Sequence, residues 1–299
     1  MKANSNLHKA KTVKNDEFYT QLTDIEKEMY HYRDHFKDKV IFCNCDDPLE
    51  SKFYFFFAQN FEFLGLKKLI STHFEKDIPS YKLELLHDVN NDGKIDVLDT
   101  IKTPLKQNGD FRSPECIAIL EEADIVITNP PFSLFREYVK QLMDYEKKFL
   151  IVGSMNAITY KEIFPLLKDN LLWLGNGSPK TFKQPDGSLK AFGNILWYTN
   201  LDYLKRHEDL LLFREYDPDE YPTYDNYDAI NVDKVKDIPM DYPGAIGVPI
   251  TFLTKHNPNQ FELIGIDRPL VEKTTGKSSR FKIDSKEKFA RIVIRNKKL

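Results

Sequence analysis

The fold class follows from the stretch Asp124-Ile125-Val126-Ile127-Thr128-Asn129-Pro130-Pro131-Phe132. Its first half is apolar and β-branched, which is typical of a buried strand. The spacing of apolar residues from Phe135 to Leu142 predicts a helix directly afterwards, with Ser133 as its N-cap. A buried strand followed at once by a helix indicates an α/β protein, and open α/β sheets bind ligands at the carboxyl ends of such strands.

The turn Asn129-Pro130-Pro131-Phe132 suits the methylation of an exocyclic amino group. Such a nitrogen is a weak nucleophile because its lone pair is conjugated with the ring. The Asn129 side-chain oxygen and the Pro130 carbonyl can accept hydrogen bonds from the NH2 group, which directs its lone pair toward an incoming methyl group. The prolines stiffen the turn, and Phe132 offers a face for stacking a flat base. The alternative is an ordinary Asn-Pro turn, but the flanking strand and helix favour catalysis.

Strand and helix patterns alternate along the chain to about residue 200, which predicts a mostly parallel, doubly wound sheet. The predicted strands of this part are 39–45, 66–73, 124–128, 149–152, 171–174 and 195–199. The predicted helices are 22–36, 53–61, one starting at Ser113-Pro114, one after Ser133 and a short one with a Thr159/Glu162 capping box. Residues 216–245 are rich in Tyr, Asp and Pro, and strand patterns return at 248–253, 261–266 and 290–294. We therefore predict two regions, 1–199 and 200–299.

The composition indicates a soluble globular protein. Hydrophobic residues make up 41% of the 299 positions and charged residues 30%. We expect a cytoplasmic protein without a membrane segment, because no apolar run is long enough to span a bilayer and the first residues lack an apolar signal core. The odd cysteine count, Cys43, Cys45 and Cys116, has no metal-type spacing and predicts reduced thiols.

The charge is unevenly distributed. The formal net charge is -3, yet residues 272–299 contain ten Lys/Arg against three Asp/Glu. A local basic segment can bind phosphates within an acidic protein, and Lys277, Arg280 and Lys282 are our candidate DNA contacts. The alternative, a solubilising tail, is equally compatible with this pattern.

Several motifs together resemble the adenine-specific DNA methyltransferases of the EcoRI modification type. They occur in the same order, nearly end to end, and only jointly are they specific. The motifs are Asp16-Glu17-Phe18-Tyr19-Thr20, Cys43-Asn44-Cys45-Asp46-Asp47-Pro48 with Ser51, Gly109-Asp110-Phe111-Arg112-Ser113, Asn129-Pro130-Pro131-Phe132-Ser133-Leu134-Phe135, and Asn194-Ile195-Leu196-Trp197-Tyr198-Thr199-Asn200.

The resemblance implies a Rossmann-like fold that binds S-adenosylmethionine in residues 1–199, with target recognition in residues 200–299. It implies double-stranded DNA as the partner, with the target adenine flipped into a site closed by Asn129, Pro130, Pro131 and Phe132. The donor-binding residues that it implies are Phe18, Tyr19 and Thr20 on the N-terminal side, Cys45, Asp46, Asp47 and Pro48 at the methionine part, and Asp110 and Phe111 at the adenine.

The sequence departs from the usual donor-binding pattern in two places. The turn after the first strand lacks the glycines that most such folds use there, and Asp46-Asp47 has the alternative of a helix N-cap. Asp110 has the alternative of a plain Gly-Asp turn. For the acid that binds the donor ribose, His73, Glu75 and Asp77 lie near the expected position, and we choose Glu75.

Two further features have competing interpretations. Trp197 and Tyr198 resemble the motif that lines the target-base pocket, but they can equally pack a core. Residues 88–99 match a twelve-residue calcium loop, with Gly93 at its sixth position. The flanking alternation and the Asn91-Asp92-Gly93 turn favour a tight hairpin instead, so we expect no metal requirement.

The same Asn-Pro-Pro-aromatic chemistry serves two other substrates, an RNA adenine and a protein glutamine. A non-enzymatic calcium-binding or nucleic-acid-binding module is the remaining alternative. The DNA recognition sequence, a cognate endonuclease and the oligomeric state have no signal in the sequence.

Overall fold

The structure, a computed structural model, describes residues 19–76, 79–184 and 187–299. Phe18 and Asp77 therefore lie outside the described residues. The chain divides into two compact units. Unit 1 comprises Met1–Ala157 and Leu174–Asp202, and unit 2 comprises Ile158–Trp173 and Tyr203–Leu299. The segment Ile158–Trp173, which a division at residue 199 assigns to the first region, thus groups with the C-terminal part of the chain.

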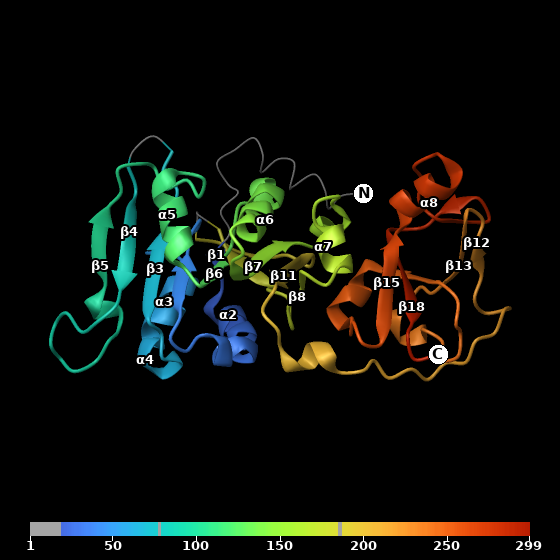
Figure 1. The fold of residues 1–299 in the computed structure, drawn as a ribbon, viewed down its shortest axis with the longest axis horizontal. Coiled ribbons are helices and arrows are strands. Elements are labelled where there is room, and N and C mark those ends of the chain that lie inside the picture. The colour runs from blue at the N-terminus through green and yellow to red at the C-terminus, as the bar shows by residue number, and fades with distance from the viewer. Residues whose placement is uncertain (1–18, 77–78, 185–186) are drawn as a thin grey trace. The chain divides into compact units, whose positions relative to one another are not determined.

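An eight-stranded mixed sheet has the order β5-β4-β3-β2-β6-β7-β11-β8 (Figure 1). Its strands are β2 (Val40–Cys43), β3 (Lys68–Thr72), β4 (Tyr81–Leu85), β5 (Ile101–Pro104), β6 (Ile125–Thr128), β7 (Lys148–Ser154), β8 (Trp173–Leu174) and β11 (Ile195–Thr199). The four central strands, β3-β2-β6-β7, are parallel. β4 and β5 add to one side in antiparallel fashion, and β11 pairs antiparallel with β7. The parallel part is therefore smaller than the sequence patterns predict.

The strand order reverses direction between β2 and β6. From β2 the chain moves to β3 on one side, whereas β6 returns to the other side of β2 and continues to β7. Because β2 and β6 are parallel, with Ile41 opposite Ile125 and Phe42 opposite Val126, their carboxyl ends lie next to each other. Such a switch point is where open α/β sheets bind ligands.

The helices follow local signals at some ends and not at others. Their bounds are α2 (Leu22–Met29), α3 (Lys52–Gln59), α4 (Phe61–Leu64), α5 (Pro114–Glu122), α6 (Phe135–Asp144), α7 (Phe164–Lys168) and α8 (Asp267–Thr275). Ser113 caps α5 as predicted, because its side chain accepts the Cys116 N–H. α2 continues as a 3-10 helix, η1 (Tyr30–His35), so the predicted helix 22–36 changes type half-way.

Two predicted N-caps are wrong. Ser133 lies inside a 3-10 turn, η3 (Phe132–Leu134), that leads into α6, whose N-cap is Leu134. The Thr159/Glu162 capping box does not start a helix, since α7 begins only at Phe164, next to a proline that suits a first turn.

The segment that joins β4 to β5 differs from the predicted tight hairpin. The two strands are antiparallel, but residues 86–100 between them form a long loop that contains the 3-10 helix η2 (Val97–Asp99). The Asn91-Asp92-Gly93 turn lies within that loop, with φ of 62° at Asn91 and 87° at Gly93.

The acidic side chains of this loop bind backbone N–H groups of the loop itself. Asp88 accepts from Asn91 and Gly93, while Asp99 accepts from Val89, Asn90 and Asp96. These N–H groups hold the pKa of Asp99 below its usual value. Within the described ranges, no group of three His, Cys, Asp or Glu side chains is arranged to hold a metal ion. Independence of calcium stays a prediction.

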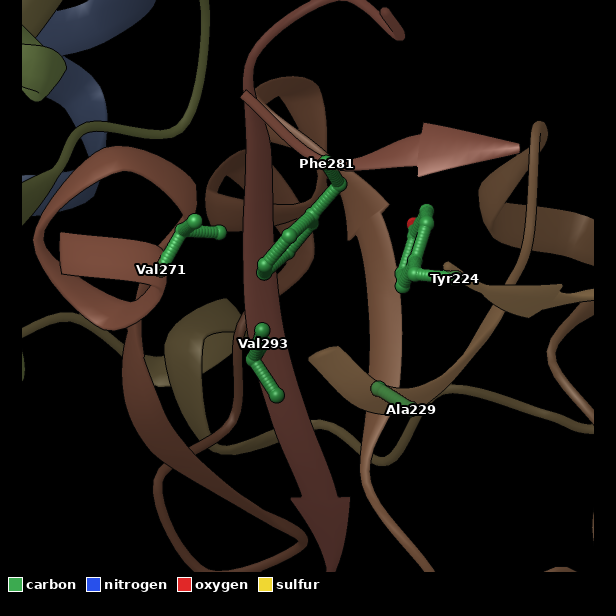
Figure 2. Close-up of a cluster of buried hydrophobic side chains, with 5 residues drawn as sticks. All are labelled: Tyr224, Ala229, Val271, Phe281 and Val293. Carbon is green, nitrogen blue, oxygen red and sulfur yellow. The ribbon is translucent and has the colours of Figure 1, made fainter. Parts of the chain in front are cut away.

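Unit 2 is built around a five-stranded sheet with the order β12-β13-β14-β18-β15. Its strands are β12 (Thr223–Tyr224), β13 (Tyr227–Asn231), β14 (Ile246–Pro249), β15 (Phe261–Ile266) and β18 (Arg291–Asn296), and β16 (Lys282–Ile283) and β17 (Lys286–Glu287) form a separate hairpin. The predicted strand 248–253 ends at Pro249, where the 3-10 helix η7 (Ile250–Lys255) follows. Figure 2 shows a core cluster of Tyr224, Ala229, Val271, Phe281 and Val293.

A membrane-crossing segment would need a long apolar helix, and the described part of the chain contains none.

Candidate functional site

Side chains fasten the adjacent ends of β2 and β6 to each other. The Thr128 hydroxyl, at the end of β6, donates to the carbonyl of Asn44, which follows β2. The Asn44 side-chain oxygen accepts from the hydroxyl of Tyr138 on α6. Asn44 is only 4% exposed, so it orients the strand ends from within the protein. Asn44 has no role among the predictions from the sequence, although its position as a polar residue at the end of a buried strand could have indicated one.

The Asn129 turn starts at this fastened edge. Asn129 is 6% exposed and Pro130 is buried, whereas Pro131 and Phe132 are half-buried. The next aromatic residue, Phe135, is buried and packs edge-on against Tyr198 at 5.0 Å between ring centroids. Phe132 is therefore the aromatic ring of this motif that stays accessible to a ligand.

The turn after β2 is shaped by its acids. Cys45 adopts a left-handed φ of 78°, and the buried Asp46 carboxylate accepts a hydrogen bond from Ser51 Oγ at 3.4 Å. Asp47 Oδ1 accepts from the Leu49 N–H at 2.9 Å. The N-cap of α3 is Ser51, which accepts from the Phe53 N–H, so the alternative in which Asp46 and Asp47 cap that helix is wrong.

The three cysteines are free thiols, and Cys45 lies in this same turn. Burial, and to a smaller extent the neighbouring Asp46 carboxylate, raises the pKa of Cys43 and of Cys45. Burial also raises the pKa of Cys116. All three side chains are therefore neutral at physiological pH, which makes them poor nucleophiles.

The N-terminal strand β1 (Tyr19–Thr20) lies close to the segment that follows the β2 turn. It pairs with β9 (Thr181–Lys183), which forms a hairpin with β10 (Leu189–Ala191). Lys183 Nζ lies 2.9 Å from the Glu50 carboxylate. Thr20 Oγ1 is buried and has no hydrogen-bond partner among the described residues, which is the arrangement expected of a side chain that binds a polar ligand group.

The candidate ribose and adenine segments meet at the end of β3. Glu75 Oε1 lies 3.0 Å from His73 Nε2, and the Glu75 N–H donates to the Asn108 carbonyl at 2.8 Å. Gly109 has a φ of +76° and packs so closely that a Cβ there would overlap the His73 carbonyl oxygen. The close approach brings Asp110 to the same edge of the sheet as Glu75.

Asp110 is already engaged by a neighbour. Its two carboxylate oxygens accept from the Arg112 guanidinium at 2.8 and 2.6 Å, and one also accepts the Arg112 N–H. The guanidinium lowers the pKa of Asp110. The turn-forming role that we gave as the alternative is therefore present, although an ionised carboxylate has lone pairs for further donors. Phe111 is buried, and its ring lies edge-on to Tyr138 at 5.0 Å.

The family described as "Adenine-specific methyltransferase EcoRI" matches residues 6–297 of the chain. The chain belongs to the EcoRI adenine-specific methyltransferase family. It is 47% identical to the type II methyltransferase M.EcoRI of Escherichia coli, over 99% of this chain and 98% of that protein. It is 39% identical to M.MpnI of Mycoplasma pneumoniae (97% and 98%) and 37% to M.MgeORF184P of Mycoplasma genitalium (98% and 99%). No solved structure matches the chain significantly.

Membership in the EcoRI methyltransferase family confirms the resemblance and the predicted enzyme class. The chain is an adenine-specific DNA methyltransferase of the restriction-modification type. The alternatives of a protein-glutamine methyltransferase and of a non-enzymatic binding module are therefore wrong. Methyltransferases of this kind generally use S-adenosylmethionine as donor.

Trp197 and Tyr198, candidates for the target base in this EcoRI-type methyltransferase, are core residues in the structure. Trp197 is 1% exposed and lies edge-on to Phe53, and Tyr198 is fully buried and donates to the Ser154 carbonyl at 2.8 Å. Both rings pack against their own sheet and helices, which favours the packing interpretation. We assign neither residue to the base.

The candidate DNA-binding cations of the methyltransferase differ in their surroundings. Arg280 pairs with the buried carboxylate of Asp267 at 3.0 Å, so its charge is needed inside unit 2. Lys277 is exposed and Lys282 is half-buried, and neither makes an ion pair with any described residue. The structure thus separates one structural cation from two that remain candidates for phosphate.

Proposed function

We propose that this chain transfers a methyl group from S-adenosylmethionine to N6 of an adenine flipped out of duplex DNA. The reaction site is the Asn129 turn, in a Rossmann-like, doubly wound sheet. One observation carries the proposal: the Asn129 and Asp46 turns leave adjacent parallel strands at the topological switch point, and the Thr128–Asn44 hydrogen bond fastens those strand ends. An acceptor site and a donor site are thus side by side.

The residues at this edge suit the chemistry of the donor. Asp46 offers a buried carboxylate for the ammonium group, and Thr20 offers a buried hydroxyl. The other residues that we propose to contact the donor are Phe18, Tyr19, Cys45, Asp47, Pro48, Glu75, Asp110 and Phe111. When bound, S-adenosylmethionine supplies an electrophilic methyl group on a sulfonium.

Asn129, Pro130 and Phe132 act on the acceptor. The Asn129 side-chain oxygen and the Pro130 carbonyl accept hydrogen bonds from the N6 amino group, which orients its lone pair and increases its electron density. Phe132 stacks on the base, and Pro131 keeps the turn rigid. The base has to leave the duplex because its N6 atom is inaccessible within the stack. Catalysis then rests on positioning, to which the fastened strand ends contribute.

A methylation assay tests this function directly. Purified protein with tritiated S-adenosylmethionine is expected to label duplex DNA and to leave RNA unlabelled. Sequencing the DNA of a host that expresses the chain is expected to show N6-methyladenine at one recurring sequence. Label that appears in RNA, or on another base, would contradict the proposal.

We place the protein in the cytoplasm. An enzyme that methylates cellular DNA acts in the compartment that contains the DNA, and its three free thiols suit a reducing cytoplasm.

Phe132→Ala is expected to weaken binding of the flipped base by about 1–3 kcal/mol, the scale of one lost aromatic stack. The measurement is a titration with duplex that carries fluorescent 2-aminopurine at the target position. Phe63→Ala is the control, because Phe63 is an exposed ring of unit 1 on α4. Equal affinity and fluorescence for both variants would show that Phe132 does not stack on the base.

Target recognition we assign to the C-terminal region 200–299, with the basic segment 272–299 on the phosphates. Residues 272–287 of this segment contain four lysines, Lys273, Lys277, Lys282 and Lys286, and none of them makes an ion pair with a described residue. Phe281 anchors their segment, since its buried ring stacks on Tyr224 at 4.4 Å (Figure 2). The backbone that carries these lysines is therefore attached to the core of unit 2.

Lys277→Glu combined with Lys282→Glu is expected to lower the log–log salt dependence of DNA affinity by about 2, at roughly 0.9 per lost phosphate contact. Binding is measured at several salt concentrations, and circular dichroism checks the fold. The control reverses Lys234 and Lys236, exposed lysines of the same unit, for an identical change in net charge. Equal salt slopes in the two double variants would exclude this segment. Arg280 stays unchanged, because its loss would leave Asp267 buried and unpaired.

A further inference from the structure

Tyr81, the first residue of β4, connects two segments of the proposed donor site. Its hydroxyl donates to Asp47 Oδ1 at 2.9 Å. Its ring lies edge-on to the ring of His73, with 4.7 Å between the ring centroids, and Lys102 Nζ lies 3.6 Å from the Tyr81 centroid. Burial, followed by the Asp47 carboxylate, raises the pKa of Tyr81, so the hydroxyl keeps its proton and remains a donor.

His73 extends the connection to the other donor segments. It is buried, with Nε2 3.0 Å from Glu75 Oε1 and Nδ1 3.3 Å from Ser80 Oγ. The Ser80 hydroxyl also donates to the His73 carbonyl at 2.7 Å, and Gly109 packs against that same carbonyl. The orientation of the imidazole ring is thus fixed from several sides.

The pair Tyr81–His73 therefore lies between three segments that are distant in sequence. One is the turn that contains Asp47, the second contains Glu75, and the third is the loop of Gly109 and Asp110. These segments follow β2, follow β3 and precede α5, so no single helix or strand sets their spacing. A donor that contacts all three binds tightly only if the spacing is set beforehand, since ordering loops on binding costs affinity.

We propose that Tyr81 is a positioning residue for the methyl donor, acting through Asp47 and through His73 rather than by touching the donor. This inference rests on the proposed donor site. The hydroxyl fixes the carboxylate of the Asp47 turn, and the ring holds the His73 ring that orients Glu75. Tyr81 thereby sets donor affinity and leaves the acceptor chemistry at Asn129 unchanged.

The test is Tyr81→Phe, which removes the hydroxyl and keeps the ring. The Kd for S-adenosylmethionine, measured by calorimetry, is expected to rise about tenfold, the effect of losing a hydrogen bond to a charged group. The kcat at saturating donor is expected to stay within about twofold. Tyr81 arranges the donor-binding segments of the free enzyme, so its hydroxyl affects donor binding and not the later methyl-transfer step. Tyr54→Phe is the matched control: it loses a hydroxyl contact of the same 2.9 Å length, to Thr100, in the same unit.

A double-mutant cycle identifies the partner. In an Asp47→Ala background, Tyr81→Phe is expected to have almost no further effect on the Kd, since the hydroxyl no longer has its acceptor. An unchanged Kd in Tyr81→Phe, a fall in kcat instead of affinity, or the same tenfold loss with Asp47 removed would each overturn the inference. Failure of the wild-type protein to bind S-adenosylmethionine would instead overturn the donor site itself, so the two failures are distinguishable.

Discussion

Asn129→Ala is expected to lower the rate of methyl transfer by about 10²–10³ while donor binding stays close to that of the wild-type protein. The side-chain oxygen of Asn129 is the acceptor that we assign to the adenine amino group, and alanine has no replacement for it. Removing one such preorganised polar group from an active site typically lowers kcat by about 10²–10³. The proposed acceptor contact at Asn129 and the proposed donor contacts lie on different segments of the chain.

The assay combines single-turnover methylation of duplex DNA with calorimetry of S-adenosylmethionine. Ser133→Ala is the matched control, because Ser133 is exposed, lies in the 3-10 turn Phe132–Leu134 and is not the N-cap of α6. Its turnover is expected to equal the wild-type value. Turnover of Asn129→Ala within a few-fold of that value would overturn the assignment, and a parallel loss of donor affinity would mean that the substitution disturbs the strand ends.

The parts of the fold that the sequence predicts well are those with local causes. The apolar run of β6 and the Ser113-Pro114 helix start each depend on a few neighbouring residues. Ser133 shows the limit of such signals. It is a good N-cap by residue type, but the chain enters α6 through a 3-10 turn, and the cap position falls on Leu134.

The side-chain roles that the sequence could not decide depend on partners far away or on competition between partners. Arg280 looks like any basic residue of its segment until the fold places the buried carboxylate of Asp267, thirteen positions earlier, beside it in an ion pair. Trp197 and Tyr198 follow the same alternation whether a strand lines a pocket or crosses a core, and only the two buried faces of β11 distinguish these cases. Asp110 has a competing donor in Arg112, which belongs to the same motif, but the motif does not show that the guanidinium donates to the Asp110 carboxylate.

Unit 1 contains a second position where a large effect is expected, at a glycine and not at a catalytic group. Gly109 has a φ of +76°, which disfavours any residue with a Cβ, and its Cα faces the His73 carbonyl oxygen at close range. An alanine there cannot avoid both problems at once. Either the Asp110 loop moves away from the end of β3, or the His73 backbone moves, and each shift separates Asp110 from Glu75.

Gly109→Ala is therefore expected to lower both stability and donor affinity. The left-handed φ costs about 1–2 kcal/mol for alanine, and forcing an extra carbon into a packed site adds about 1–3 kcal/mol. Gly93→Ala is the matched control, since Gly93 has a φ of +87° with no atom within 4 Å of an added Cβ. Both variants pay the cost of a left-handed φ at alanine, so the difference between their free energies of unfolding in denaturant measures the cost of crowding at Gly109. Calorimetry is expected to show weakened S-adenosylmethionine binding for Gly109→Ala alone. Equal stabilities and equal affinities in the two variants would show that the Gly109–His73 contact does not position the Asp110 loop.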